Sequence, residues 1–192
     1  MNIAITLTSS LHVGQEYIDL THQVAERLAK DGHGIVYGGT AYGMMLELGE
    51  AYKRSGGKRL IGVMSKDLME VTKGYKAFDG LDEQYIEATY STRKDKICSK
   101  AQAVLALPGG YGTLDELVTY VTSKVNKLYD VPIALYNYNG FYDTFLAFCN
   151  EMKSKDFSKI ALEDVALVSD NLDEILEYFQ SYKPTELSDK FV

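Results

Sequence analysis

The residues best suited to chemistry form one continuous run, Pro108-Gly109-Gly110-Tyr111-Gly112-Thr113-Leu114-Asp115-Glu116. The five apolar residues before it, 103–107, suit a parallel strand covered on both faces, and Pro108 ends that strand because it has no amide hydrogen. Gly109, Gly110 and Gly112 let a ligand approach the backbone closely, and the following helix directs its unpaired amides at that ligand. The run therefore predicts a phosphate-binding turn, unless its glycines only make a tight strand-to-helix connection.

Glu116 has two interpretations. The run Thr113-Leu114-Asp115-Glu116 matches a capping box, in which the threonine caps a helix and the glutamate reaches back to the cap amide. A carboxylate beside a phosphate turn also suits catalysis. The two roles predict different effects of replacing Glu116. Loss of a cap costs about 1 kcal/mol of stability, whereas loss of a catalytic carboxylate removes turnover and leaves the fold intact.

Two further strand ends carry residues that can bind a ligand. Residues 3–7 lead into Thr8-Ser9-Ser10, and residues 35–37 lead into Gly38-Gly39-Thr40. The carboxyl ends of parallel strands meet at one edge of a sheet, so we expect Ser9, Gly39 and Thr40 to lie near the phosphate turn.

Arg93 and Lys94 begin the helix that precedes the strand of residues 103–107, and this order along the chain brings them toward the same edge. An arginine guanidinium can hold a phosphate or a carboxylate through two parallel hydrogen bonds. The alternative is that these two cations belong to a solvated helix face.

Several other kinds of site are excluded. Neither glycine cluster is a P-loop, because no Lys-Ser or Lys-Thr pair follows at the required spacing. The dinucleotide fingerprint does not fit either, since Asp115 stands where its third glycine belongs. Cys98 and Cys149 lie neither in a close pair nor beside a histidine, which argues against a metal cluster. We expect no metal and no cofactor, and a single phosphate fits the small set of amides best.

Strands and helices alternate along the chain, which predicts an α/β fold, namely a single-domain, doubly wound, Rossmann-like parallel sheet with helices on both faces. The expected strands are residues 3–7, 35–37, 60–64, 103–107 and 131–136, and the first expected helix is residues 15–30. One domain is expected over residues 1–180, followed by a weakly ordered tail over residues 181–192. Residues 65–90 lack periodicity and are expected to form a long loop over the ligand crevice.

The composition limits the partners. The chain has 192 residues, a formal net charge of −7 and a pI near 5.0. An acidic surface repels nucleic-acid backbones and anionic membranes, so neither is expected as a partner. No apolar run approaches the roughly 20 residues of a membrane span, and Met1-Asn2-Ile3-Ala4-Ile5 enters a strand without a basic region or cleavage site. A cytoplasmic location is therefore expected.

Taken together, the motifs resemble those of the LOG (Lonely Guy) family, the cytokinin riboside 5′-monophosphate phosphoribohydrolases. The most specific match is Pro108-Gly109-Gly110-Tyr111-Gly112-Thr113-x-x-Glu116, with Arg93-Lys94 upstream. The resemblance implies that Arg93 and Glu116 are the catalytic pair and that the protein is a homodimer. It also implies a set of residues that contact the nucleotide: Glu70, Lys94, Gly110, Tyr111, Gly112, Thr113 and Thr122.

The resulting hypothesis is hydrolysis of the N-glycosidic bond of a purine nucleoside 5′-monophosphate, whose base is either an N6-modified adenine or an ordinary purine. A second hypothesis is a non-catalytic protein that binds or carries a nucleotide or the molybdenum cofactor, because the same phosphate turn serves both functions. The family's older description as lysine decarboxylases is rejected, since pyridoxal phosphate catalysis needs a Schiff-base lysine and a partner for the ring nitrogen, and no such constellation is identifiable.

Overall fold

The computed structural model describes residues 1–184, 186 and 187, and it shows an α/β protein. The chain forms two compact units, which we call unit 1 (Met1–Gln102) and unit 2 (from Ala103 onward). Every pairing between named strands within each unit is parallel, so the predicted α/β fold with a Rossmann-like parallel sheet is confirmed. In the part of the chain that is described, no helix is both long enough and apolar enough to cross a membrane.

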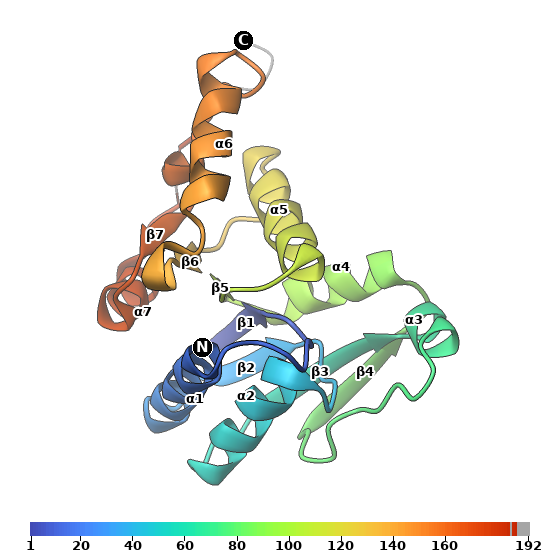
Figure 1. Ribbon diagram of the computed structural model, residues 1–192. Helices are drawn as coiled ribbons and strands as arrows, with labels where there is room; N and C mark the ends of the chain where they lie inside the picture. The colour runs from blue at the N-terminus through green and yellow to red at the C-terminus, as the bar shows by residue number, and fades with distance from the viewer. Residues whose placement is uncertain (185, 188–192) are drawn as a thin grey trace. The chain divides into compact units, whose positions relative to one another are not determined.

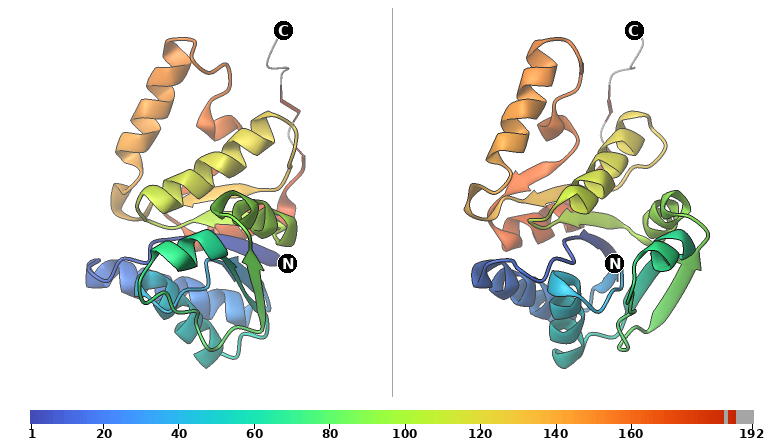
Figure 2. Two further views of the ribbon diagram at one scale, coloured as in Figure 1. Left: turned by 90° about the vertical axis from the view of Figure 1, so that its right-hand side faces the viewer. Right: turned by 45° about the vertical axis from the view of Figure 1, so that its right-hand side comes forward.

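Unit 1 contains four strands in the spatial order β4-β3-β2-β1. Its elements are β1 (Asn2–Thr6), α1 (Gln15–Lys30), β2 (Gly34–Tyr37), α2 (Gly43–Arg54), β3 (Leu60–Ser65), α3 (Lys66–Val71), β4 (Glu83–Glu87) and α4 (Tyr90–Lys100). The pairing register places Ile3 beside Ile35 and Ile35 beside Leu60. β1, β2 and β3 are almost wholly buried and mostly apolar because helices cover both faces, with α1 and α2 on one side and α4 on the other (Figures 1 and 2).

β4 was not predicted, and it forms the edge of the unit 1 sheet. Its residues alternate between half-buried and exposed, and the half-buried ones are polar. Lysines of α4 cover that face: Lys100 Nζ donates to the Tyr85 hydroxyl at 2.7 Å, and Lys96 Nζ lies 3.4 Å from Glu87. The expectation of one long loop over residues 65–90 is therefore wrong for α3 and for β4, and the irregular part is residues 72–82.

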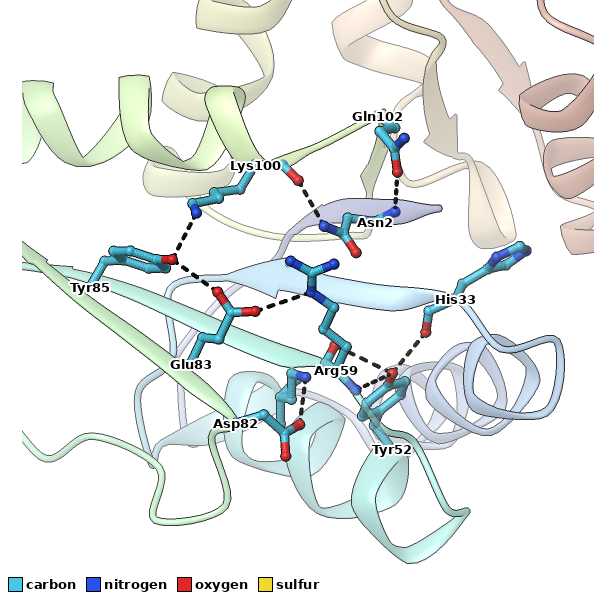
Figure 3. A network of polar contacts seen from close by, with 10 residues as sticks. Asn2, His33, Tyr52, Arg59, Asp82, Glu83, Tyr85, Lys100 and Gln102 are labelled. Atoms are coloured by element: carbon cyan, nitrogen blue, oxygen red, sulfur yellow. Dashed lines mark hydrogen bonds and ion pairs between the residues drawn. The ribbon is translucent and has the colours of Figure 1, made fainter.

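A polar network joins the amino-terminal ends of the unit 1 strands, at the edge opposite the predicted binding residues (Figure 3). Asn2 donates its backbone amide to the Gln102 side chain at 2.8 Å and its own side-chain amide to the Lys100 carbonyl at 3.1 Å. Glu83 lies 3.1 Å from Arg59 Nε and accepts from the Tyr85 hydroxyl at 2.9 Å. These contacts hold the strand ends together, so we assign this edge a structural role.

Unit 2 contains three strands in the order β5-β6-β7. Its elements are β5 (Ala103–Ala106), α5 (Tyr111–Val125), β6 (Ile133–Tyr136), the 3-10 turn η1 (Tyr138–Gly140), α6 (Asp143–Ser154), the 3-10 turn η2 (Leu162–Asp164), β7 (Leu167–Ser169) and α7 (Leu172–Ser181). Figure 2 shows α5 and α6 on one side of these strands and α7 on the other. The short strand β7 was not predicted.

The end of β5 is held from within unit 2. The Tyr142 hydroxyl, which is fully buried, donates to the Leu107 carbonyl at 2.6 Å, and burial raises the pKa of this phenol. This contact fixes the backbone immediately before the glycine turn.

At the other end of the chain α7 extends to Ser181, and the predicted tail of residues 181–192 lies partly outside the described residues, at 185 and 188–192.

Candidate functional site

The carboxyl edge of the unit 1 sheet brings two predicted segments together with the start of α2. Ser9 follows β1, and the glycine turn of residues 38–40 follows β2. Gly43, the first residue of α2, has a φ of +51°, and a Cβ built there would lie 2.2 Å from the Ser10 carbonyl oxygen. The Ser9-Ser10 turn is therefore packed directly against the start of α2. Both serines are exposed at this edge.

The turn after β2 depends on its second glycine. Gly39 has a φ of +72°, and a Cβ at this position would lie 2.7 Å from the Gly62 Cα in β3. Only glycine accommodates both that backbone conformation and so close an approach of a neighbouring strand. Thr40 is buried, and its hydroxyl lies 3.3 Å from the Met45 sulfur.

Arg93 reaches this turn from α4. Its side chain is only 4% exposed, and its Nε donates to the Val63 carbonyl at 2.8 Å. A Cβ built on Gly38 would lie 2.8 Å from Arg93 Nη2, so the guanidinium lies against the backbone of the glycine turn. The interpretation of Arg93 as part of a solvated helix face is wrong, because its guanidinium is buried at the edge where ligands bind in such sheets.

Residues 74–78 lie antiparallel to the turn after β2. Ala41 donates its amide to the Lys76 carbonyl at 2.9 Å, and Phe78 donates to the Gly39 carbonyl at 2.9 Å. The Tyr42 hydroxyl donates to the Gly74 carbonyl. These bonds hold Tyr75 close to the glycine turn. Burial raises the pKa of the Tyr75 phenol, and the positive charge of Arg93 acts in the opposite direction.

Lys94 and Glu70 are placed differently from Arg93. Lys94 is half-buried, with its ammonium 5.7 Å from the centre of the Tyr90 ring. Glu70 is exposed on the short helix α3, which begins directly after β3. The structure thus gathers Ser9, Gly39, Thr40, Arg93 and Lys94 at one edge of unit 1, with Glu70 on the surface beside it.

In unit 2 the helix after the glycine run begins earlier than a capping box requires. α5 starts at Tyr111, and its N-cap is Gly110, which has no side chain to accept a hydrogen bond. Thr113 therefore occupies the third helical position and Glu116 the sixth, so the capping-box interpretation is wrong. Both side chains are buried, with Thr113 2% exposed and Glu116 6% exposed. A buried carboxylate one turn inside a helix is costly to desolvate, and its position calls for a role other than capping.

The two glycines before α5 have different surroundings. A Cβ on Gly109 would lie 2.1 Å from the Thr113 Oγ1, whereas a Cβ on Gly110 would meet no atom within 4 Å. Packing within the fold therefore requires glycine at 109 and not at 110. Gly110 is exposed, and Tyr111 is 93% exposed. Beside them, the first turn of α5 presents backbone amides in the manner of an anion site.

Thr122 does not join the glycine turn. It lies nine residues beyond Thr113 along α5, roughly 14 Å at 1.5 Å per residue. It lines a shallow groove along α5 together with Tyr111, Leu114 and Phe145. A side chain that sequence reasoning missed is Tyr90, whose ring lies next to both Arg93 and Lys94; the spacing of three and four residues on a helix is the signal that predicts this contact.

Comparisons with known proteins agree on family and fold. The family model described as "Possible lysine decarboxylase" matches residues 44–179. The cytokinin riboside 5′-monophosphate phosphoribohydrolase LOG2 of Arabidopsis thaliana is 30% identical to this chain, over 88% of this chain and 77% of that protein. The corresponding LOG enzyme of Oryza sativa subsp. japonica is 32% identical, over 88% of this chain and 68% of that protein.

Among solved structures, the chain resembles the molybdenum cofactor carrier protein of Chlamydomonas reinhardtii. The TM-score is 0.66 at 18% sequence identity, and the match covers 93% of this chain and 96% of that one. At this level of identity the likeness concerns the fold alone.

Proposed function

The chain belongs to the LOG family, and we propose that it hydrolyses the N-glycosidic bond of a nucleoside 5′-monophosphate to give the free base and ribose 5-phosphate. Its named relatives are phosphoribohydrolases, which supports enzyme status. The observation that carries the proposal for this chain is the position of Glu116. Because α5 begins at Tyr111, Glu116 stands at the sixth position of the helix and does not cap it. Its side chain is nevertheless buried.

The chemistry follows from the charge that develops in the reaction. As the C1′–N bond lengthens, the ribose ring gains positive charge, and a carboxylate beside it stabilises that charge. In the proposal, Glu116 has this role and also accepts a proton from the water that attacks C1′. The base leaves with the electron pair of the broken bond and takes up a proton, so that base and ribose 5-phosphate are formed.

The glycine turn supplies binding energy at the unreacting end of the substrate. Backbone amides at the start of α5 suit the 5′-phosphate, and Gly110 leaves room for it because a Cβ there would meet no protein atom. A phosphate fixed in this way positions the sugar for attack. By the family resemblance, Arg93 is proposed as the other member of the catalytic pair, with its guanidinium binding the nucleotide. Ser9, Gly39, Thr40, Glu70, Lys94 and Thr122 are the remaining proposed binding residues.

The finer parts of the proposal concern substrate and assembly. Relatives named cytokinin riboside 5′-monophosphate phosphoribohydrolases favour an N6-modified adenine nucleotide as substrate. We also propose a homodimer in the cytoplasm. Light scattering of the purified protein tests the assembly, and a monomer at working concentration would contradict it.

The decisive experiment incubates the purified protein with a panel of nucleoside 5′-monophosphates that includes AMP and an N6-isopentenyl derivative. Free base and ribose 5-phosphate are measured separately, and both are expected in equal amounts from the preferred nucleotide. Glu116→Gln removes the charge and keeps the size of the side chain, so we expect it to lower kcat by roughly 10²- to 10⁴-fold while the thermal unfolding curve changes little. Undiminished release of base by this variant would reject the role of Glu116.

The same assay tests the alternative of a carrier protein. A carrier binds its ligand and returns it unchanged, so tight binding of a nucleotide without release of base from any member of the panel would reject the hydrolase.

A further inference from the structure

At the start of α4 one aromatic ring contacts two cations. Tyr90 is the first residue of the helix, and Arg93 and Lys94 follow it at spacings of three and four residues, which share a helix face. The guanidinium carbon of Arg93 lies 5.4 Å from the centre of the Tyr90 ring, and the Lys94 ammonium lies 5.7 Å from it. Both distances are within the range of cation–π attraction.

The backbone that carries the ring is fixed on both sides. The Tyr90 amide donates to the Asp67 carboxylate of α3 at 2.8 Å. Thr89 caps the helix by accepting from the Thr92 amide at 3.2 Å, and the Thr89 amide donates to the Thr92 hydroxyl at 3.2 Å in return. The first turn of α4 is therefore anchored to α3 and closed by its own cap, so the backbone position from which the Tyr90 side chain extends is fixed.

The two cations differ in what else holds them. Arg93 is buried and also bonds to the Val63 carbonyl through Nε, so that bond and the ring contact both restrict the position of its guanidinium. Lys94 is half-buried, and its ammonium is carried by a flexible four-carbon chain whose rotamers the ring contact restricts. The attraction is stronger for the buried cation, because desolvation raises the strength of cation–π contacts.

We propose that Tyr90 is a positioning residue of the active site, whose ring orients Arg93 and Lys94 for the nucleotide. This inference rests on the proposed function, since it assigns Tyr90 a role through two residues of that site. Tyr90 itself is assigned no contact with the substrate.

The same helix offers a matched control at its other end. The Tyr85 ring of β4 also lies beside two cations, with Lys100 Nζ 4.4 Å and Lys96 Nζ 5.3 Å from its centre. Tyr85 belongs to the polar network at the amino-terminal edge of the sheet, away from the predicted binding residues (Figure 3). A change at Tyr85 therefore removes a similar ring from a similar pair of cations without reaching the site.

The experiment compares Tyr90→Leu, Tyr90→Phe and Tyr85→Leu. The leucine removes the ring at Tyr90, so we expect kcat/KM for the preferred nucleotide to fall roughly tenfold, with both a higher KM and a lower kcat. Phenylalanine keeps the ring face, so Tyr90→Phe should retain kcat/KM within about twofold of wild type. Tyr85→Leu should lower the urea midpoint and leave kcat and KM unchanged. If Tyr90→Leu does not fold, Tyr90→Met takes its place, because methionine is a good helix former without a ring.

The outcomes separate this inference from the proposed function. A wild-type protein that releases no base from any nucleotide in the panel contradicts the proposed function, and calorimetric binding of AMP then tests Tyr90 alone, with a roughly tenfold weaker Kd expected for Tyr90→Leu. With an active wild type, kinetics of Tyr90→Leu that match those of Tyr90→Phe would overturn the positioning role. So would an equal loss of kcat/KM in Tyr85→Leu, because the effect would then be a general consequence of loosening α4.

Discussion

The side chain of Thr113 lies directly against the backbone of Gly109, so that a Cβ on this glycine would be 2.1 Å from the Thr113 Oγ1 and 2.7 Å from its Cβ. The third residue of α5 thereby closes the turn that leads into the helix. Gly110, one position later, has open space where its side chain would be. Packing thus requires glycine at position 109, whereas at position 110 the reason we propose for glycine is access of the phosphate to the backbone.

This difference predicts opposite phenotypes for Gly109→Ala and Gly110→Ala. The first variant should lose about 1 to 3 kcal/mol of unfolding free energy, because the new methyl group overlaps Thr113. The second should lose less than about 1 kcal/mol, since its φ of −92° suits any residue. It should nevertheless lower kcat/KM at least about tenfold, because the methyl group stands where the phosphate approaches. Urea unfolding and steady-state kinetics measure the two effects, and a Gly110→Ala enzyme with normal kcat/KM would contradict the binding role of this position.

A similar argument applies to Gly43, where the Ser9-Ser10 turn meets α2. Gly43→Ala combines a φ of +51° with a Cβ 2.2 Å from the Ser10 carbonyl oxygen, so we expect a loss of more than about 2 kcal/mol. Gly56→Ala is the control, because Gly56 has a φ of +81° and nothing within 4 Å of its Cβ position. It should lose only the conformational part, about 1 kcal/mol. Equal losses in urea unfolding would show that the Ser10 carbonyl moves freely and that the two segments are not packed.

The sequence predicted most of the frame of unit 1 and the turn of unit 2. Continuous apolar runs identified β1, β2, β3, β5 and β6, and the periodicity of the first helix gave the observed bounds of α1, Gln15–Lys30. These elements are buried on one or both faces, so their buried positions carry apolar residues and can be recognised from the sequence. β4 was not predicted because its covered face consists of Glu83, Tyr85 and Glu87, whose polar groups are paired with lysines and an arginine from elsewhere in unit 1. A search for short-range hydrophobic patterns cannot detect partners that are distant in the sequence.

The candidate site shows the same division. The glycine run and the placement of Arg93 at the carboxyl edge were predicted. The start of α5 was not, because Thr113 to Glu116 matches the capping box in residue types and spacing. The structure begins the helix at Tyr111 after a glycine N-cap. The residue types alone do not decide which of two acceptable starts a helix uses, and with the observed start Thr113 packs against Gly109 four residues earlier. The burial of Arg93 likewise depends on the Val63 carbonyl, 30 residues away in the sequence.

The network in Figure 3 predicts a loss of stability in acid. The hydrogen bond from the Tyr85 hydroxyl, together with the charge of Arg59, holds the pKa of Glu83 below its ordinary value of 4.5. The unfolded chain therefore binds this proton more readily, so the contribution of Glu83 is present above about pH 4.5 and is lost as the pH falls through the lower folded value. Urea midpoints of wild type and Glu83→Gln should differ most between about pH 5 and 7 and converge in acid.

Tyr85→Phe is the matched control for this prediction, because it removes the donated hydrogen bond and keeps the carboxylate. The pKa of Glu83 should then rise toward its ordinary value, and the acid-dependent difference between this variant and the double variant with Glu83→Gln should shrink. A difference between wild type and Glu83→Gln that stays constant from pH 7 to pH 3 would contradict the linkage.

A buried lysine at the end of α5 gives the last prediction. Lys124 is only 2% exposed, its ammonium donates to the Val131 carbonyl at 3.2 Å, and it lies 3.8 Å from Asp130. Burial lowers the pKa of this lysine against the opposing effect of Asp130, so in the fold the charge costs more than its partner returns. We therefore expect the unfolding free energy of Lys124→Met, which keeps the packed stem, to stay within about 1 kcal/mol of wild type or to exceed it at pH 7. Lys124→Ala should lose about 2 kcal/mol or more of unfolding free energy.

The stability of wild type relative to Lys124→Met should also depend on pH. The unfolded chain holds the proton of Lys124 up to about pH 10.5, so the stability of wild type should rise relative to that of Lys124→Met as the pH rises toward that value. Urea unfolding at pH 7 and pH 9.5 measures both effects, and equal losses in the methionine and alanine variants at pH 7 would show that the ammonium contacts stabilise the fold.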